Sequence, residues 1–259
     1  MIEALQHITV EFEGVAAIVT MRRADRRNAL SLEMMREIER AFRELGERSD
    51  VRAIVLAGEG PAFSAGHDLR ELLQRERADY EAIFDQCVRL MTAIAEIQQP
   101  VIAEVATIAT AAGCQLVAAC DLAVASTHAR FATPGVRIGL FCSTPMVALS
   151  RAISRKRAME MLLTGEMIDA RTALAWGLVN RVVEPEELRT ASLELAGKVA
   201  QGARAVVRLG KAAFYRQLDL PVDEAYAFAR DVMVANAQEP DAQEGIAAFV
   251  GKRPPNWHP

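Results

Sequence analysis

Residues 101–125 read VIAEVATIATAAGCQLVAACDLAVA, and the order of residue types in this stretch decides the fold class. A β-branched run predicts a buried strand over 101–105, and a buried helix is expected from about Ala112, after a loop of small residues. A second strand is expected over 121–125. The 16 uncharged residues inside this stretch are fewer than the roughly 18 that a membrane-spanning helix needs. The stretch therefore predicts strand–helix–strand alternation in a globular core.

The same alternation extends outward from this stretch. A hairpin is expected over 8–21, a helix behind an N-cap at Ser31, and a strand over 51–57. A charged helical stretch is expected over 69–97, and almost continuous helix from about Thr144 onward. Strands that alternate with helices predict an α/β body with largely parallel pairing.

The last 60 or so residues carry an apolar stripe at helical spacing. Such a stripe suits packing on the body of the protein or on another subunit. Its members are Phe214, Leu218, Ala225, Phe228 and Val232.

Composition excludes several classes of protein. Of the 259 residues, 51% are hydrophobic and 25% charged, which is typical of a globular chain and not of a disordered one. Thirty Lys and Arg against 34 Asp and Glu leave no basic excess, so a nucleic-acid partner is not expected. Four cysteines without metal-ligand spacing predict reduced thiols and a cytoplasmic location, and the N-terminal residues show no secretory signal. The four scattered histidines give no support to a metal site.

Two loops offer backbone N–H groups to a ligand. The first is residues 64–68, between a strand end and a helix start, and the second is residues 110–115, where a helix begins among very small side chains. Two N–H groups aimed at one point would form an oxyanion hole. The side chain of Gln115, one turn after Ala112, is expected to reach over whatever the Ala112 amide holds. Tight helix–strand packing is an equally good explanation of the small residues.

The same residues resemble a known family, the enoyl-CoA hydratase/isomerase (crotonase) family. The resemblance covers nearly the whole chain, in order and at matching spacings. Residues 110–118 and 131–136 are similar to one branch of that family in particular. The residues that carry the family resemblance are Ser64 to Leu69, Pro100 to Ala103, Ala111 to Leu116, Cys120 to Ala123, Phe131, Pro134-Gly135, Gly139, Leu163 to Gly165, Ala173, Gly177 to Val179, Phe249 and Lys252 to Pro254.

The resemblance implies a fold and a ligand. The fold is a spiral of ββα turns over residues 1–196, followed by a helical region over 197–259 that mediates trimers, often paired into hexamers. The ligand is an acyl-CoA thioester, whose carbonyl is held by the backbone amides of His67 and Ala112. No cofactor is implied beyond the coenzyme A of the substrate.

The positions of the two catalytic glutamates depart from the family pattern. Gln115 and Gly135 stand where family hydratases have Glu. Hydration needs a base for the water proton and an acid for the α-carbon, and neither residue supplies one. We therefore expect a lyase-type enzyme with weak hydratase activity, which Gln115→Glu with Gly135→Glu should raise. Ser143 lies where some members place a third carboxylate, although a role beside a helix N-cap suits it better.

Other residues are assigned by the resemblance to the substrate or to coenzyme A. Arg26, Arg27 and Lys252 could contact the phosphates, the last of them from a neighbouring subunit, although a solvated basic face explains them about as well. Ala65, Asp68 and Phe249 are also placed at the substrate.

Four further side chains are given more modest roles. The side chain of His67 is expected to lie in the pocket or at the surface. Glu104 is expected to be paired with another residue for structural reasons. Cys114 and Cys142 would flank the pocket as small apolar side chains.

Two alternative functions remain open at this point. One is an acyl-CoA-binding protein without turnover. The other is a hydrolase or decarboxylase that needs only the oxyanion hole and a positioned water.

Overall fold

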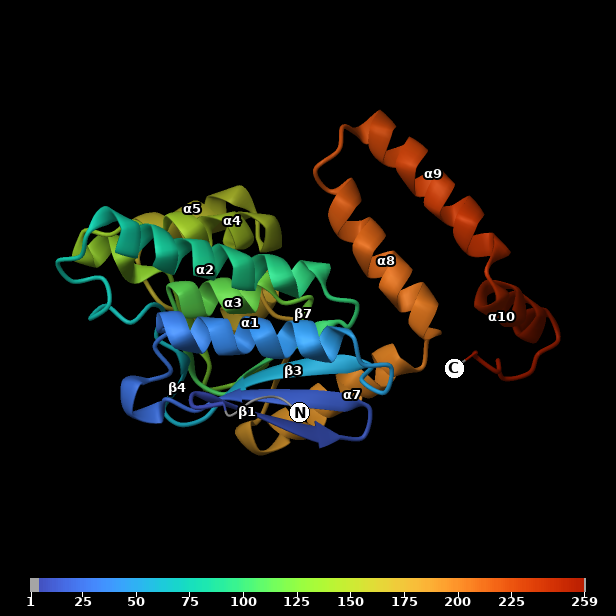
Figure 1. Cartoon of the computed structure of the whole chain (residues 1–259), viewed down its shortest axis with the longest axis horizontal. Helices are drawn as coiled ribbons and strands as arrows, with labels where there is room; N and C mark the ends of the chain where they lie inside the picture. Colours follow the sequence, from blue (N-terminus) through green and yellow to red (C-terminus); the bar gives the residue numbers. More distant parts are fainter. Residues whose placement is uncertain (1–4, 259) are drawn as a thin grey trace. The chain divides into compact units, whose positions relative to one another are not determined.

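Pairs of strands followed by a helix recur along the first part of the chain (Figure 1). The structure is a computed structural model that describes residues 5–258. Four ββα groups open the chain and further helices follow, with two short strands among them. The elements are β1 (Ile8–Glu13), β2 (Ala16–Met21), α1 (Leu32–Gly46), β3 (Ala53–Gly58), β4 (Ala62–Ser64), α2 (Arg77–Glu96), β5 (Val101–Val105), β6 (Ile108–Thr110), α3 (Ala112–Ala119), β7 (Leu122–Ser126), β8 (Arg130–Ala132), α4 (Ser143–Ala152), α5 (Arg155–Thr164), β9 (Ile168–Asp169), α6 (Ala170–Trp176), β10 (Arg181–Val183), α7 (Leu188–Ala200), α8 (Arg204–Gln217), α9 (Val222–Gln238) and α10 (Pro240–Val250).

The strands of the described residues are divided between two sheets. The larger has the order β1-β2-β3-β5-β7-β10 and the smaller the order β4-β6-β8-β9. In the larger sheet β1 and β2 are antiparallel and every later pairing is parallel. From the second group onward, the first strand of each ββα group joins the larger sheet and the second joins the smaller one. The chain therefore winds as a spiral, and the α/β class with largely parallel pairing is confirmed.

Alternation along the central strands gives the larger sheet two buried faces. In β3, Ile54 and Leu56 pack with the residues of α1, α2 and α3, whereas Ala53 and Val55 pack with Leu188 and other residues of α7. Successive side chains of a strand point to opposite faces, so a strand covered on both faces is apolar throughout. Figure 1 shows α1, α2 and α3 stacked on one side of the strands.

Several local predictions are confirmed. The hairpin over 8–21 is present with full antiparallel register. Ser31 caps α1, and its hydroxyl accepts a hydrogen bond from the amide of Met34 at 3.2 Å. The strand expected over 101–105 and the helix expected from Ala112 begin where the sequence placed them.

Other local predictions are wrong. The helical stretch expected over 69–97 is helical only from Arg77, and residues 69–74 form turns. The strand β6 lies where a loop of small residues was expected, and β8 lies where no element was predicted. The strands β9 and β10 interrupt the region expected to be almost all helix. Strands of two or three residues carry no measurable alternation, so pairing with neighbours decides them.

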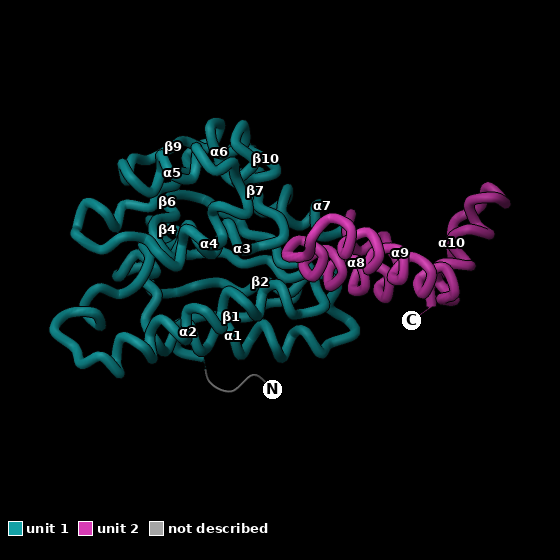
Figure 2. The backbone as a smooth tube through the Cα atoms, turned by 90° about the horizontal axis from the view of Figure 1, so that it is seen from above, with its two compact units in different colours: residues 1–197 teal, residues 198–259 magenta. Residues whose placement is uncertain are grey.

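The chain divides into two compact units, residues 1–197 and residues 198–259 (Figure 2). The second unit consists of α8, α9, α10 and the segment after them. Many large apolar side chains of this unit are exposed, among them Phe214, Leu218, Tyr226, Met233 and Phe249. Its helices therefore present apolar surface that the unit itself does not cover.

Candidate active site

The loop after β4, residues 64–68, is fixed by a bridge to Leu30. The amide of Leu30 donates to the carbonyl of Gly66 at 2.7 Å, and the amide of Asp68 donates to the carbonyl of Leu30 at 3.0 Å. A parallel bridge uses the groups on either side of its central residue, here His67. The N–H of His67 is therefore directed away from Leu30.

A buried serine anchors the start of this loop. The Ser64 hydroxyl donates to the carbonyl of Asn28 at 2.8 Å and accepts from the amide of Gly66 at 3.3 Å. The Asn28 side chain in turn donates to the carbonyl of Ala62 at 2.8 Å. Since both side chains are fully buried, the loop backbone has little freedom.

Helix α3 begins directly against the same loop. Gly66 has φ +90°, and a Cβ there would lie 2.7 Å from the Ala111 Cβ and 3.2 Å from the backbone nitrogen of Ala112. A Cβ on Gly113 would lie 2.3 Å from the carbonyl oxygen of Ser64. Ala111 itself adopts φ +50° and ψ −120°, a strained conformation for alanine. The small residues thus serve tight packing, and this packing brings the backbone of the two loops together.

The amide of Ala112 belongs to the first residue of α3. Such an amide has no carbonyl partner within its helix. Among the described residues, neither this N–H nor that of His67 donates to a protein acceptor. Two unpaired N–H groups on touching segments suit the binding of a carbonyl oxygen. The oxyanion hole itself stays a prediction.

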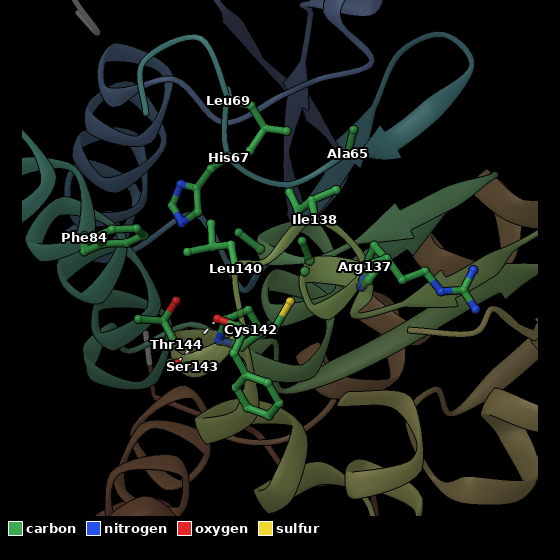
Figure 3. Close-up of a pocket in the computed structure, with 16 residues that line it drawn as sticks. Ala65, His67, Leu69, Phe84, Arg137, Ile138, Leu140, Cys142, Ser143 and Thr144 are labelled. Carbon is green, nitrogen blue, oxygen red and sulfur yellow. Dashed lines mark hydrogen bonds between the residues drawn. The ribbon is translucent and has the colours of Figure 1, made fainter. Parts of the chain in front are cut away.

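A cavity of about 590 Å³ opens beside these two segments (Figure 3). No Asp or Glu is among its described lining residues, and His67, Arg137 and Cys142 are the titratable ones. Leu69 precedes α2 and Phe84 lies on it, so this segment forms part of the wall as expected. The lining residues are Ala65, His67, Leu69, Phe84, Ala111, Ala112, Pro134, Gly135, Arg137, Ile138, Leu140, Phe141, Cys142, Ser143, Thr144 and Pro145.

The imidazole of His67 stands in the wall of this cavity. It meets the ring of Phe84 edge-on, with centroids 5.4 Å apart and an interplanar angle of 87°. Burial lowers the pKa of His67 to about 4, because the charged ring would lose its hydration. The imidazole is therefore neutral near pH 7. Phe84 is 17 positions away in the sequence, where no local pattern could reveal the contact.

Gln115 lies away from the cavity. Its side chain is buried, and its Oε1 accepts a weak hydrogen bond from the Cys87 thiol of α2 at 3.7 Å. It is not among the described residues that line the cavity. The hydrogen bond directs its oxygen to Cys87 of α2. The expectation that the side chain reaches over whatever the Ala112 amide holds stays a prediction.

Gly135 lines the cavity but has no room for a side chain. A Cβ at this position would lie 2.0 Å from the carbonyl oxygen of Leu140 and 2.8 Å from the sulfur of Cys142. The amide of Leu140 also donates to the carbonyl of Gly135 at 3.0 Å, which closes the segment over the glycine. A side chain at position 135 therefore requires this segment to rearrange. The expectation that Gln115→Glu with Gly135→Glu raises activity stays a prediction.

Ser143 is exposed at the cavity and begins α4. Its hydroxyl makes only a long bond, 3.4 Å, to the carbonyl of Phe141. Burial raises the pKa of the Cys142 thiol and raises that of Cys114 to about 12. The structure places no base within hydrogen-bond distance of the Ser143 hydroxyl among the described residues. Ser143 and Cys142 therefore belong to the wall, whereas Cys114, which was expected to flank the pocket, is not among the described lining residues.

The basic loop before α1 lies next to the cavity rim. The amide of Ala65, a lining residue, donates to the carbonyl of Arg27 at 3.0 Å. Arg26 and Arg27 are exposed, and Arg26 pairs with the neighbouring Asp25 at 3.3 Å. Their assignment to the phosphates of coenzyme A stays a prediction.

Asp68 has a structural partner instead. Its carboxylate accepts from the guanidinium of Arg23 at 3.0 Å, and both side chains are largely buried. This ion pair joins the loop to the segment before α1. Asp68 is not among the described lining residues, so its ion pair holds the loop without facing the cavity.

Glu104 also has a structural partner, as expected. It accepts a forked pair of hydrogen bonds from Arg189 of α7, at 2.9 Å from both Nε and Nη2. This contact raises the pKa of Arg189. The pair fastens α7 to the sheet.

Phe249 and Lys252 lie in the second unit. Phe249 is 86% exposed at the end of α10, and Lys252 follows it with φ +52°. Their assignment to the substrate stays a prediction.

The described residues provide no metal site, because they contain no group of three or more His, Cys, Asp or Glu placed to hold a metal ion. None of the helices in the described part combines the length and apolar character needed to cross a membrane.

Comparison with known proteins identifies the relatives of this chain. The family model described as enoyl-CoA hydratase/isomerase matches residues 11–259. Enoyl-CoA hydratase domain-containing protein 3, mitochondrial, from Mus musculus is 48% identical over 250 residues, which cover 96% of this chain and 83% of that protein. The protein of the same name from Homo sapiens is 47% identical over 248 residues, 95% of this chain and 82% of that protein.

Solved structures agree with the sequence comparison. An enoyl-CoA hydratase from Mycobacterium smegmatis has a TM-score of 0.95 and 47% identity, covering 98% of this chain and 100% of that one. Human enoyl coenzyme A hydratase domain-containing protein 3 has a TM-score of 0.94 and 44% identity, covering 97% of this chain and 100% of that one. These matches confirm the crotonase-like ββα spiral with a helical C-terminal region. They also confirm the resemblance to one branch noted over 110–118 and 131–136.

The expected cytoplasmic location is wrong on this comparison. The relatives from mouse, rat, Xenopus laevis and human are named as mitochondrial proteins. Reduced, buried cysteines indicate a reducing environment but do not distinguish one reducing compartment from another.

Proposed function

Because the chain belongs to the enoyl-CoA hydratase/isomerase family, we propose that it binds an acyl-CoA thioester with the carbonyl oxygen between the backbone amides of His67 and Ala112. The acyl group would occupy the cavity bounded by Phe84 and Leu140. The proposal concerns this chain's own substrate and site, which the family alone does not specify.

One observation carries the proposal. The loop 64–68 and the start of α3 touch at Gly66, whose added Cβ would lie 3.2 Å from the nitrogen of Ala112. Both proposed donors are unpaired backbone N–H groups beside an apolar cavity. Fixed donors in such surroundings stabilise the negative charge that a thioester oxygen acquires, by roughly 10²–10³ in rate for each donor.

The same cavity has little to offer for hydration. Adding water across the double bond requires a group that removes a proton from water and a group that protonates the α-carbon. Each contributes about 10²–10⁴ in rate. The described lining residues contain no carboxylate. We therefore expect polarisation of the thioester and weak hydration, at least about 10²-fold below a family member that has both glutamates.

Binding without turnover is the second candidate function. It is favoured by the same absence of carboxylates from the described lining, together with the low basicity of His67, whose pKa burial lowers to about 4. A hydrolase or decarboxylase that uses only the two amides and water is also consistent with the donors. Product analysis with malonyl-type and branched acyl-CoA thioesters separates these possibilities, because only turnover yields free acid or carbon dioxide.

Coenzyme A and subunit contacts complete the proposal. Arg26 and Arg27 beside the rim would contact the phosphates of coenzyme A, and Lys252 would do so from a neighbouring subunit. We propose a homotrimer or hexamer formed through the second unit, because its apolar side chains are widely exposed. Light scattering coupled to gel filtration tests the oligomer, with a monomer as the contradicting result.

The binding mode is tested in two ways. A crystal structure with a bound CoA thioester should place the carbonyl oxygen about 3 Å from both amide nitrogens. In solution, Ala112→Pro removes one N–H at a helix position that tolerates proline, whereas Ala112→Gly keeps it. Calorimetric titration should show acyl-CoA binding lost in the first and retained in the second. Equal binding of acyl-CoA by both folded variants would contradict the assignment of the Ala112 N–H as a donor to the thioester oxygen.

Turnover is tested on crotonyl-CoA. Steady-state hydration should be slow at saturating substrate for the reason given above. A rate typical of two-glutamate hydratases would show that another group supplies the acid and the base.

A further inference from the structure

The two ring nitrogens of His67 are unpaired. Neither Nδ1 nor Nε2 has exposed surface, and neither has a hydrogen-bond partner among the described residues. Buried polar side-chain atoms in proteins usually have a partner, so such a ring invites a functional explanation. The ring lines the cavity beside the two proposed donor amides.

The surroundings of the ring are apolar and uncharged. Phe84 contacts it edge-on, and Leu69 and Leu140 line the same cavity (Figure 3). Leu69 is 53% exposed and Leu140 is 44% exposed. Because neither ring nitrogen has exposed surface, a ligand reaches them only when a neighbouring side chain moves.

The charged side chains of the cavity do not favour a charged ligand group beside the His67 ring. Arg137 is the permanent cation among the lining residues described, and its Nε donates to the carbonyl of Thr164 at 2.9 Å. Figure 3 shows its guanidinium directed away from His67. A carboxylate placed at the His67 ring would lose its hydration without meeting the Arg137 guanidinium, which is unfavourable. A neutral imidazole instead offers one N–H donor and one nitrogen acceptor, and a hydroxyl group can bond to either.

We propose that the imidazole of His67 recognises a hydroxyl group on the acyl part of the thioester. This inference rests on the proposed function, because the backbone N–H of the same residue would hold the thioester oxygen. The hydroxyl therefore lies within the first few carbons of the acyl chain. The protein then selects hydroxyacyl thioesters over plain hydrocarbon ones, since a hydrocarbon chain leaves both nitrogens unpaired.

The test is a binding panel on the full-length protein. Butyryl-CoA is compared by calorimetric titration with 2-, 3- and 4-hydroxybutyryl-CoA, in wild type, His67→Phe and His67→Gln. All three proteins keep the backbone N–H, and only phenylalanine removes hydrogen bonding. In wild type, at least one hydroxy isomer should bind about tenfold more tightly than butyryl-CoA. That ratio should fall to about one in His67→Phe and be partly kept in His67→Gln.

The outcomes separate this inference from the proposed function. If all four thioesters bind wild type equally, or if the preference survives in His67→Phe, the recognition by His67 is overturned while acyl-CoA binding stands. If no CoA thioester binds, the proposed function itself fails. A merely structural role of the ring would change all four affinities by the same factor. Should His67→Phe not fold, wild type and His67→Gln still decide the question.

Discussion

The two sides of the cavity are built in different ways. The amide side, residues 64–68 with the start of α3, uses backbone groups and is locked by glycines that cannot bear a side chain. The facing segment, residues 134–145, is where a second catalytic carboxylate would have to stand, and here the backbone closes over Gly135. The proposed oxyanion hole needs no particular side chain, so Ala at position 112 is compatible with it. Acid–base catalysis depends on side chains, so it cannot survive their loss.

The largest expected effect comes from forcing carboxylates onto both sides. In Gln115→Glu with Gly135→Glu, one carboxylate replaces a buried amide and the other requires an atom 2.0 Å from the Leu140 oxygen. We expect a loss of more than about 5 kcal/mol in the free energy of unfolding, comparable with the whole stability of many domains. Urea titration measures it. A folded double variant with increased crotonyl-CoA hydration would show that the facing segment is adaptable.

The substitution Gly113→Ala disrupts only the amide side of the cavity. The added methyl group would lie 2.3 Å from the Ser64 oxygen, so α3 must move off the loop. We expect a destabilisation of about 3–5 kcal/mol and loss of acyl-CoA binding, by urea unfolding and titration. Gly139→Ala on the facing segment is the matched control, because nothing lies within 4 Å and only its φ of +76° is unfavourable. Its cost should be about 1–2 kcal/mol, and equal costs would contradict the difference between the two sides.

The pH dependence of stability sharpens the comparison at His67. Its pKa is lowered from 6.5 to about 4 in the folded protein, so between these values the unfolded chain binds a proton that the folded one does not. The stability that His67 contributes is therefore complete above pH 6.5. It is lost as the pH falls toward 4, which lowers the free energy of unfolding by about 3 kcal/mol. His67→Gln should remove that part of the pH profile in urea unfolding. His128→Gln, at an exposed position, is the control. Identical pH profiles of stability for the two variants would contradict a neutral, buried His67 ring in the folded protein.

The smallest expected effect tests the rim of the amide side. Arg27→Ala should weaken binding of an acyl-CoA about threefold to tenfold, and the difference should shrink as salt is added. Arg36→Ala, on the exposed face of α1, controls for loss of one positive charge. An equal loss of acyl-CoA affinity in both variants would show that the net charge of the protein, and not a phosphate contact of Arg27, causes the effect.

Local residue patterns predicted the longer elements well and the short ones badly. The hairpin and β5 have enough alternating or β-branched residues to be recognised. The three-residue strands β6 and β8 do not, although they place the loop that leads into Ala112. At the site, the two loops followed from the residue pattern, and the assignment of the amides to His67 and Ala112 came from the family resemblance and stays a prediction. The direction of the Gln115 side chain did not follow from the residue pattern, because it depends on α2, 28 positions earlier.

The amino-acid sequence by itself determined that this is an α/β protein, that two loops of small residues precede helices, and that positions 115 and 135 carry no carboxylate. These are statements about residue identity, spacing and local backbone preference, which the chain contains directly. Only the tertiary structure decided that Gly135 has no room for a side chain, that Gln115 turns to Cys87, and that the His67 ring nitrogens are unpaired. Free space and hydrogen-bond partners arise from contacts between distant segments, and no local pattern contains them.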